Sequence, residues 1–97
     1  MAESATPASG DDIVRTVTLR LDEGLHVRPC SQIAAVAGQS AGQVTLRVGD
    51  RSADASSMLE MMALGVEPGT ELQVVGTETA AASVEQIVAM FESNFAD

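Results

Sequence analysis

The feature that most constrains the fold of this chain is the order of its hydrophobic patterns, which switch along the sequence between the two-residue period of strands and the roughly 3.6-residue period of helices. Segments typical of short strands lie at residues 13–21, 44–48, 51–55 and 71–75. Segments typical of amphipathic helices lie after the first strand, between the third and fourth strands, and after the last strand. The order β-α-β-β-α-β-α predicts an α+β two-layer open-faced sandwich, in which a four-stranded antiparallel sheet carries three helices on one face.

Proline, glycine and serine residues mark the borders of the predicted helices. Pro29 suits the first turn of the first helix, where a missing N–H costs nothing, and Gly38 and Gly42 flank its end. Either Ser56 or Ser57 caps the short second helix, which ends before the glycine that follows Leu64. The last helix is predicted to start with a capping box and to carry one apolar stripe. The box pairs Ser83 with Gln86, and the stripe holds Val84, Ile87, Val88, Phe91 and Phe95.

Length and composition indicate one small domain with an aliphatic core. The chain has 97 residues, of which 45% are hydrophobic, and only two of them, Phe91 and Phe95, are aromatic. Residues 1–12 are small, polar and without periodicity, so we expect a disordered N-terminal tail. Residues 13–97 then form the domain.

The charge balance disfavours two classes of partner. The formal net charge is −9, and the five basic residues are all arginines, which disfavours nucleic acid and anionic membranes as partners.

No apolar run is long enough to span a bilayer, and no secretory signal is visible. The single cysteine, Cys30, cannot form an internal disulfide, which agrees with a cytoplasmic location. One histidine and one cysteine cannot supply a zinc site, so we expect no metal and no cofactor.

The only histidine, His26, lies in the segment Gly-Leu-His-Val-Arg-Pro. Histidine can offer an unprotonated ring nitrogen near neutral pH, and Arg28 can hold an anion through charge-assisted hydrogen bonds. The proline places a helix start here, where backbone N–H groups and the helix dipole attract anions. These features predict a phosphoryl group carried on His26. Leu25 is expected to fill the core behind the loop, and Cys30 to be a buried core residue rather than a reactive thiol.

Two blocks of the sequence resemble the HPr family, the histidine-containing phosphocarriers of the sugar phosphotransferase system. The first is Gly-Leu-His-Val-Arg-Pro-Cys at residues 24–30, which fits the family's Gly-[Leu/Ile]-His-x-Arg-Pro pattern followed by a small residue. The second begins with Ser57-Met58-Leu59, ends in Leu64-Gly65, and is followed by Gly69. The order and spacing of the elements also fit from about residue 13 to residue 95.

This resemblance implies a function for the first block. His26 would accept a phosphoryl group at ring Nδ1 from enzyme I, which takes it from phosphoenolpyruvate, and pass it to an enzyme IIA domain or a regulator. Arg28 would stabilise the phosphate. The protein would be a cytoplasmic phosphoryl carrier in sugar transport rather than an enzyme, and it would act as a monomer.

The second block has two implied roles. In many HPr proteins the serine that matches Ser57 is phosphorylated by a dedicated kinase, whereas in others it only caps its helix. Met58, Leu59 and Met62 are assigned to a docking patch for enzyme I and enzyme IIA, since methionine suits a surface that accepts several partners. The acidic residues Glu23 and Glu60 depart from the family pattern and bear on which partner is recognised.

Two other functions compete with the carrier. In one, the chain is a regulatory HPr paralogue that acts through phosphorylation of Ser57 and through the docking patch, with His26 idle. In the other, it is a phosphohistidine hydrolase, which needs a second histidine or a strong acid-base group and more cations than this chain has.

Overall fold

The computed structural model describes residues 12–96, and four strands form a single antiparallel sheet within them. The order in the sheet is β1-β4-β2-β3, so the last strand lies between the first two. The strands are β1 (Ile13–Thr18), β2 (Val44–Val48), β3 (Arg51–Asp54) and β4 (Glu71–Gly76).

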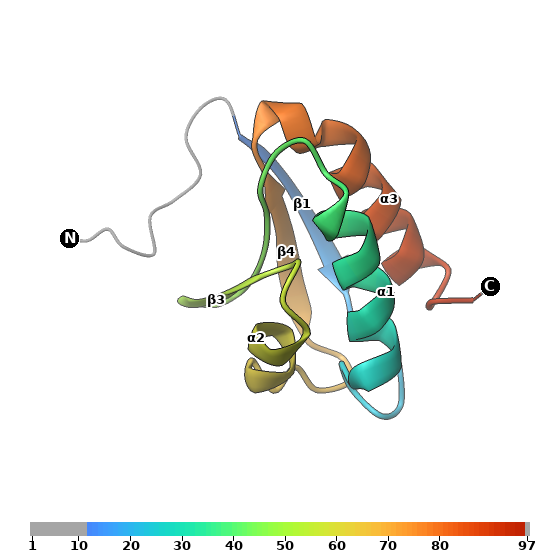
Figure 1. The fold of residues 1–97 in the computed structure, drawn as a ribbon. Helices are drawn as coiled ribbons and strands as arrows, with labels where there is room; N and C mark the ends of the chain where they lie inside the picture. The colour runs from blue at the N-terminus through green and yellow to red at the C-terminus, as the bar shows by residue number, and fades with distance from the viewer. Residues whose placement is uncertain (1–11, 97) are drawn as a thin grey trace.

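In the same part of the chain, residues 12–96, the α-helices are α1 (Val27–Gly38), α2 (Met58–Ala63) and α3 (Ala81–Glu92). A short 3₁₀ helix, η1 (Glu78–Ala80), leads into α3. Figure 1 shows α1 and α3 side by side along one face of the sheet, with α2 near the N-terminal end of α1. The predicted fold class and the predicted order of elements are confirmed.

The core lies between the sheet and this helical layer, and its residues are mainly aliphatic. In the sheet, Val17 pairs with Leu72 and Leu46 pairs with Val74, so all four side chains face the helices. Alternation in β4 therefore sets which face of the sheet is buried. The largest fully buried side chains are Leu19, Ile33, Leu46, Met61, Leu72, Ile87, Val74, Val84 and Cys30.

The first strand is shorter than the alternating pattern predicts. Ladder pairing of β1 ends at Thr18, although Leu19 is fully buried and Leu21 packs against the core. Leu19 still exchanges backbone hydrogen bonds with the β4 approach, accepting from Gly69 and donating to Thr70. The alternation of apolar residues thus predicts which side chains are buried, but it does not predict where the regular hydrogen-bonded pairing of β1 ends. β3 ends one residue earlier than predicted, and β4 runs one residue further.

The predicted start of the last helix is wrong. The helix begins at Ala81 after η1, its N-cap is Ala80 without a side-chain cap, and Ser83 lies inside it. The Ser83–Gln86 capping box therefore does not form at a helix start. Three consecutive alanines, residues 80–82, favour helix so strongly that it extends past the serine.

The predicted apolar stripe of this helix holds for four of its five members. Val84, Ile87, Val88 and Phe91 are buried in α3. Phe95 lies beyond the end of the helix, in a segment that turns back on α3. Its ring still packs on the core, edge-on to Phe91 with centroids 4.9 Å apart.

The predicted N-terminal tail, residues 1–12, lies outside the described residues except for Asp12. Within residues 12–96, no helix is both long enough and apolar enough to cross a membrane.

Candidate functional site

The loop that carries His26 is fixed by backbone hydrogen bonds on both sides of Gly24. The Gly24 amide donates to Leu21 at 3.1 Å, and the His26 amide donates to the Gly24 carbonyl at 3.0 Å. Between them, the Leu25 amide donates to Val66 at 3.0 Å, which ties the loop to the segment after α2. Gly24 has φ +74°, and a Cβ atom there would lie 2.7 Å from the Val66 carbonyl oxygen. Only glycine fits this conformation and this close approach.

His26 is the N-cap residue of α1. Its backbone is extended, with φ −100° and ψ −170°, and its carbonyl accepts the first helical bond from Cys30 at 3.1 Å. Its side chain makes no capping hydrogen bond, and no acidic residue lies in the first turn. The ring keeps 36% of its surface exposed. This helix start therefore presents an accessible imidazole beside a positive helix terminus.

The structure brings His26 and Arg28 together at one shallow depression of about 350 Å³. Arg28 is exposed in the first turn of α1. The two residues share the depression with one polar side chain from α1 and with residues that follow α3. Its lining consists of Leu21, His26, Arg28, Pro29, Gln32, Asn94, Phe95 and Ala96.

Sequence reasoning did not place several of these lining residues at the site, among them Gln32, Asn94 and Phe95. Gln32 could have been found, because it lies four residues after Arg28 and so shares its helix face. Asn94 and Phe95 reach the site only because the chain reverses after α3, with φ of 57° and 59°. The Phe95 amide closes this turn by donating to the Met90 carbonyl at 2.7 Å. The sequence around His26 contains no pattern that predicts contact with Asn94 and Phe95.

An acidic residue lies directly against the imidazole. Glu23 Oε1 is 3.5 Å from His26 Nε2, and the Glu23 side chain is 79% exposed. The ring nitrogen that faces Glu23 is thus Nε2, and Nδ1 is the ring nitrogen outside this pair.

Cys30 lies behind the site and is fully buried, as expected. Its Sγ contacts the Leu25 carbonyl oxygen at 3.7 Å, so the thiol links α1 to the His26 loop. Burial raises the pKa of the Cys30 thiol to about 11, because the thiolate would lose its hydration. The thiol is therefore a poor nucleophile near neutral pH. Leu25 is also buried, as the sequence predicts.

Ser57 is the N-cap of α2, which settles the choice between it and Ser56. Its Oγ accepts a hydrogen bond from the Glu60 amide at 3.2 Å, and the residue is partly buried. The Glu60 carboxylate turns back and accepts from the Asp54 amide at 2.9 Å. Hydrogen bonds from Ser56 hold the pKa of Asp54 below its ordinary value. The start of α2 is therefore capped by its own residues.

The residues assigned to the docking patch differ in exposure. Leu59 is 80% exposed and Met62 38%, whereas Met58 is partly buried and packs against the core. Met61 is fully buried. Val27, directly after His26, is 52% exposed and was missed by sequence reasoning. These residues lie on α1 and α2, two helices that pack against each other.

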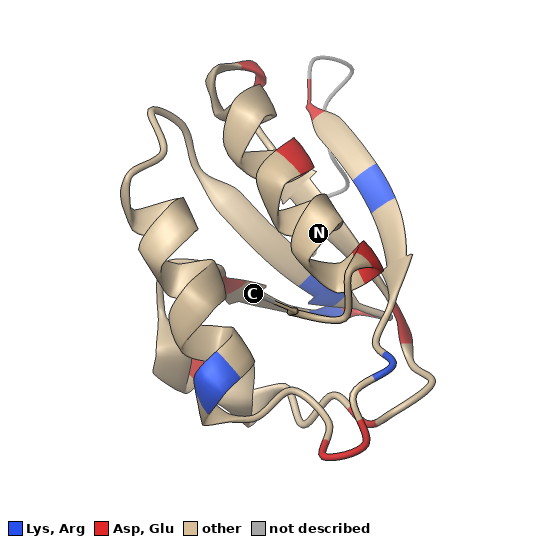
Figure 2. Ribbon diagram, turned by 90° about the vertical axis from the view of Figure 1, so that its right-hand side faces the viewer, with Lys and Arg blue, Asp and Glu red and all other residues tan. Residues whose placement is uncertain are grey.

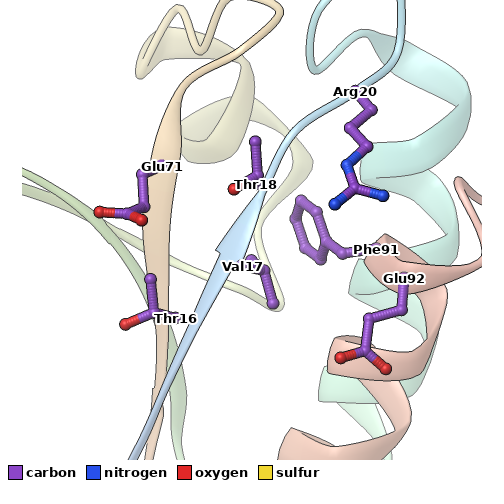
Figure 3. Close-up of a pocket in the computed structure, with 7 residues that line it drawn as sticks. All are labelled: Thr16, Val17, Thr18, Arg20, Glu71, Phe91 and Glu92. Atoms are coloured by element: carbon purple, nitrogen blue, oxygen red, sulfur yellow. The ribbon is translucent and has the colours of Figure 1, made fainter.

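A second depression, of about 170 Å³, lies between β1, β4 and the end of α3 (Figure 3). Arg20 and Glu92 lie above and below the Phe91 ring in this view, and Glu71 lies on β4. It holds one cation and two carboxylates, an arrangement that does not favour an anion. No residue of the predicted phosphoryl site lines it.

The charges of the molecule are scattered rather than gathered into a basic surface. Figure 2 shows acidic residues on helices, strands and loops. The five arginines lie on five different segments: β1, the loop after β1, α1, β2 and β3. Among the described residues, no group of three or more His, Cys, Asp and Glu side chains could hold a metal ion.

The fold and the exposed imidazole define a class: small open-faced α+β sandwiches that present one histidine at the start of a helix. Residues 13–93 match the PTS-HPr family, described as "PTS HPr component phosphorylation site", and the chain belongs to this family of phosphotransferase-system phosphocarriers.

Individual relatives agree with this assignment. The chain is 30% identical over 77 residues to phosphocarrier protein HPr of Haemophilus influenzae, covering 78% of this chain and 91% of the relative. It is 28% identical over 82 residues to phosphocarrier protein NPr of Shewanella violacea, covering 84% and 90%. The fold is similar to a crystal structure of HPr from Thermoanaerobacter tengcongensis, with a TM-score of 0.80, 22% identity, and coverage of 88% and 97%.

Proposed function

We propose that this protein accepts a phosphoryl group on His26 from enzyme I and passes it to an enzyme IIA domain. Enzyme I would take the group from phosphoenolpyruvate, and the relay would serve sugar transport. The observation that carries the proposal is the start of α1. His26 is partly exposed there, its side chain makes no capping bond, and Arg28 lines the same depression.

The transfer asks the protein mainly for position and charge compensation. The lone pair of Nδ1 attacks the phosphorus of the donor, and a new P–N bond forms. The old bond from phosphorus to the donor breaks, and its electron pair returns to the donor. Negative charge on the equatorial oxygens is met by Arg28 and by the N–H groups at the start of α1. The second transfer reverses these steps towards the acceptor.

Docking is proposed for the apolar surface beside the site. Leu59 and Met62 of α2 are exposed large apolar side chains, and Val27 extends this surface to the residue after His26. A partner that covers it would stand close to the imidazole. Each partner must use the surface in turn, so we infer that the carrier acts as a monomer. Because phosphoenolpyruvate is a cytoplasmic metabolite, we place the protein in the cytoplasm.

A second candidate function is regulation through phosphorylation of Ser57. It is favoured by one observation, since Ser57 stands at the start of the helix that carries Leu59 and Met62. A phosphate there would add negative charge at this surface and would alter docking. A serine kinase and a regulator would then be further partners. If Ser57→Ala abolished a regulator complex in cells while His26→Ala had no effect, regulation would replace the relay as the main function.

Labelling separates the two functions. The protein is incubated with an enzyme I and isotopically labelled phosphoenolpyruvate, alongside His26→Ala and Ser57→Ala. We expect an acid-labile, base-stable phosphate on the wild type and on Ser57→Ala, and none on His26→Ala. Full labelling of His26→Ala would refute the proposal.

A further inference from the structure

We propose that Glu23 is a positioning residue that keeps the proton of the neutral His26 ring on Nε2 and so leaves the lone pair of Nδ1 available. This inference deepens the proposed function and rests on it. It assigns to Glu23 a role in the transfer itself, whereas sequence comparison alone marks this acid only as a departure that affects partner choice.

The first support is geometric. Glu23 Oε1 lies 3.5 Å from His26 Nε2, which is within ion-pair range and longer than an ordinary N–H···O hydrogen bond. The pair is held by a turn rather than by two flexible chains alone. The Gly24 amide donates to Leu21, and the His26 amide donates to Gly24, so the backbone between the two side chains is fixed. The left-handed conformation of Gly24 is part of the same turn.

The second support is the chemistry of the two groups. A carboxylate is only an acceptor, whereas a neutral imidazole has one N–H and one lone pair. If the proton were on Nδ1, the Nε2 lone pair would face the negative oxygen of Glu23. With the proton on Nε2, the N–H faces that oxygen instead. The carboxylate therefore favours the tautomer in which Nδ1 is unprotonated, just as a buried aspartate fixes the histidine of a serine-protease triad.

The third support is the charge change during transfer. When the Nδ1 lone pair forms the P–N bond, Nε2 keeps its proton and the ring gains positive charge. The donor recovers the electron pair of the bond that breaks. Glu23 faces the Nε2 side of the ring, away from the new bond, so its charge offsets the ring charge. Arg28, which lines the depression with His26, would meet the phosphoryl oxygens.

The tautomer can be measured without any phosphoryl transfer. Protein labelled with ¹⁵N histidine is studied by NMR at about pH 8.5, where an ordinary imidazole is neutral. We expect the wild type to show Nε2–H as the dominant form. Glu23→Gln should shift the ratio of tautomers towards Nδ1–H by about two- to fivefold, the scale of an exposed ion pair, and Glu23→Lys should shift it further. Equal ratios in all three proteins would overturn the proposal.

Kinetics test the consequence, with Asp22→Asn as the matched control. Asp22 is exposed in the same turn, so this variant removes the same charge one residue away. Glu23→Gln should slow labelling by enzyme I and phosphoenolpyruvate about two- to fivefold, and Asp22→Asn should have a smaller effect. Equal slowing by both variants would reduce Glu23 to a general charge effect and contradict the proposal. If the wild type itself took up no phosphate, the proposed function would fail, and the NMR ratios would still decide the role of Glu23.

Discussion

The starts of α1 and α2 are built in opposite ways. At α1, the N-cap His26 makes no side-chain capping bond, and the first turn holds no acid. At α2, the N-cap Ser57 accepts from the Glu60 amide, and the Glu60 carboxylate lies in the first turn. Both helices expose backbone N–H groups at the same kind of terminus. Only α2 supplies its own oxygen and its own negative charge to meet them.

The start of α1 can therefore receive an anion. At the start of α2, the Ser57 oxygen and the Glu60 carboxylate already supply the oxygen and the negative charge that an anion would bring. An incoming phosphoryl group at α1 would meet a positive helix end, an arginine and no acid in the first turn of the helix. A phosphate on Ser57 would instead meet Glu60 and would alter the existing cap. The first arrangement suits repeated gain and loss of a phosphoryl group, whereas the second suits a change of state.

The largest effect is expected from removing the cation of the α1 site. Arg28→Ala should slow phosphoryl transfer about tenfold to a hundredfold, because a charge-assisted hydrogen bond contributes about 1.5–3 kcal/mol. Arg20→Ala, which removes an arginine from the other depression, is the matched control and should have little effect. The test is the rate at which enzyme I labels each variant. Equal rates for Arg28→Ala and Arg20→Ala would contradict the role of Arg28.

The next largest effect concerns the turn before α1. Gly24→Ala should lower the free energy of unfolding by about 2 kcal/mol, since it combines a left-handed backbone with a clash against the Val66 carbonyl. Gly49→Ala also has a left-handed backbone, φ +60°, but its Cβ would meet nothing within 4 Å, so about 1 kcal/mol is expected. Denaturant titration measures both. Equal losses would show that the close approach to Val66 is unimportant.

A direct test of the two caps compares alanine at each N-cap. Ser57→Ala should destabilise the protein by about 1 kcal/mol, the usual value of a serine cap. His26→Ala should cost less than about 0.5 kcal/mol, because no side-chain cap is lost. If His26→Ala were the more destabilising variant in urea unfolding, the contrast between the two helix starts would be wrong.

The remaining effects are those of pH, and they have opposite signs at the two helix starts. The pKa of Cys30 in α1 is raised from 9.0 to about 11, so its stabilising effect is complete below pH 9 and is lost as the pH rises to about 11. The pKa of Asp54, before α2, is lowered, so its effect is present above the ordinary value and is lost as the pH falls through the folded value. Asp54 is largely accessible to solvent, so screening keeps its effect small.

Unfolding curves across the pH range test both signs. Cys30→Ala should remove the alkaline decline that comes from the thiol, and Asp54→Asn should reduce the acidic one. An alkaline decline of the same size in Cys30→Ala would show that other groups cause it.

Sequence patterns identify the elements of this fold well because most of them rest on local periodicity. β2 was predicted with the correct bounds, since alternation and flanking turns agree there. The capping pattern at Ser83 failed, because the preceding alanines extend the helix past it. Phe95 continues the spacing of the α3 stripe, yet two left-handed residues take it out of the helix. At Ser83 and Phe95 more than one local structure is compatible with the sequence, and packing in the folded protein determines which one forms.

The candidate site divides in the same way. His26 and Arg28 belong to one short segment, so their proximity follows from the sequence. Asn94 and Phe95 join them through a reversal at the end of the chain, which no pattern near His26 announces. The contact of Glu23 with Nε2 occurs across the turn at Gly24, and the next residue, Leu25, is hydrogen-bonded to the distant Val66.

The central claim is that the phosphoryl group resides on one ring nitrogen at the start of α1. The most direct test is combined ³¹P and ¹⁵N NMR of histidine-labelled protein after incubation with enzyme I and phosphoenolpyruvate. We predict a phosphorus signal coupled to Nδ1 of His26, which disappears in acid. A phosphorus signal coupled to Nε2, or a phosphate found only on Ser57, would contradict the account.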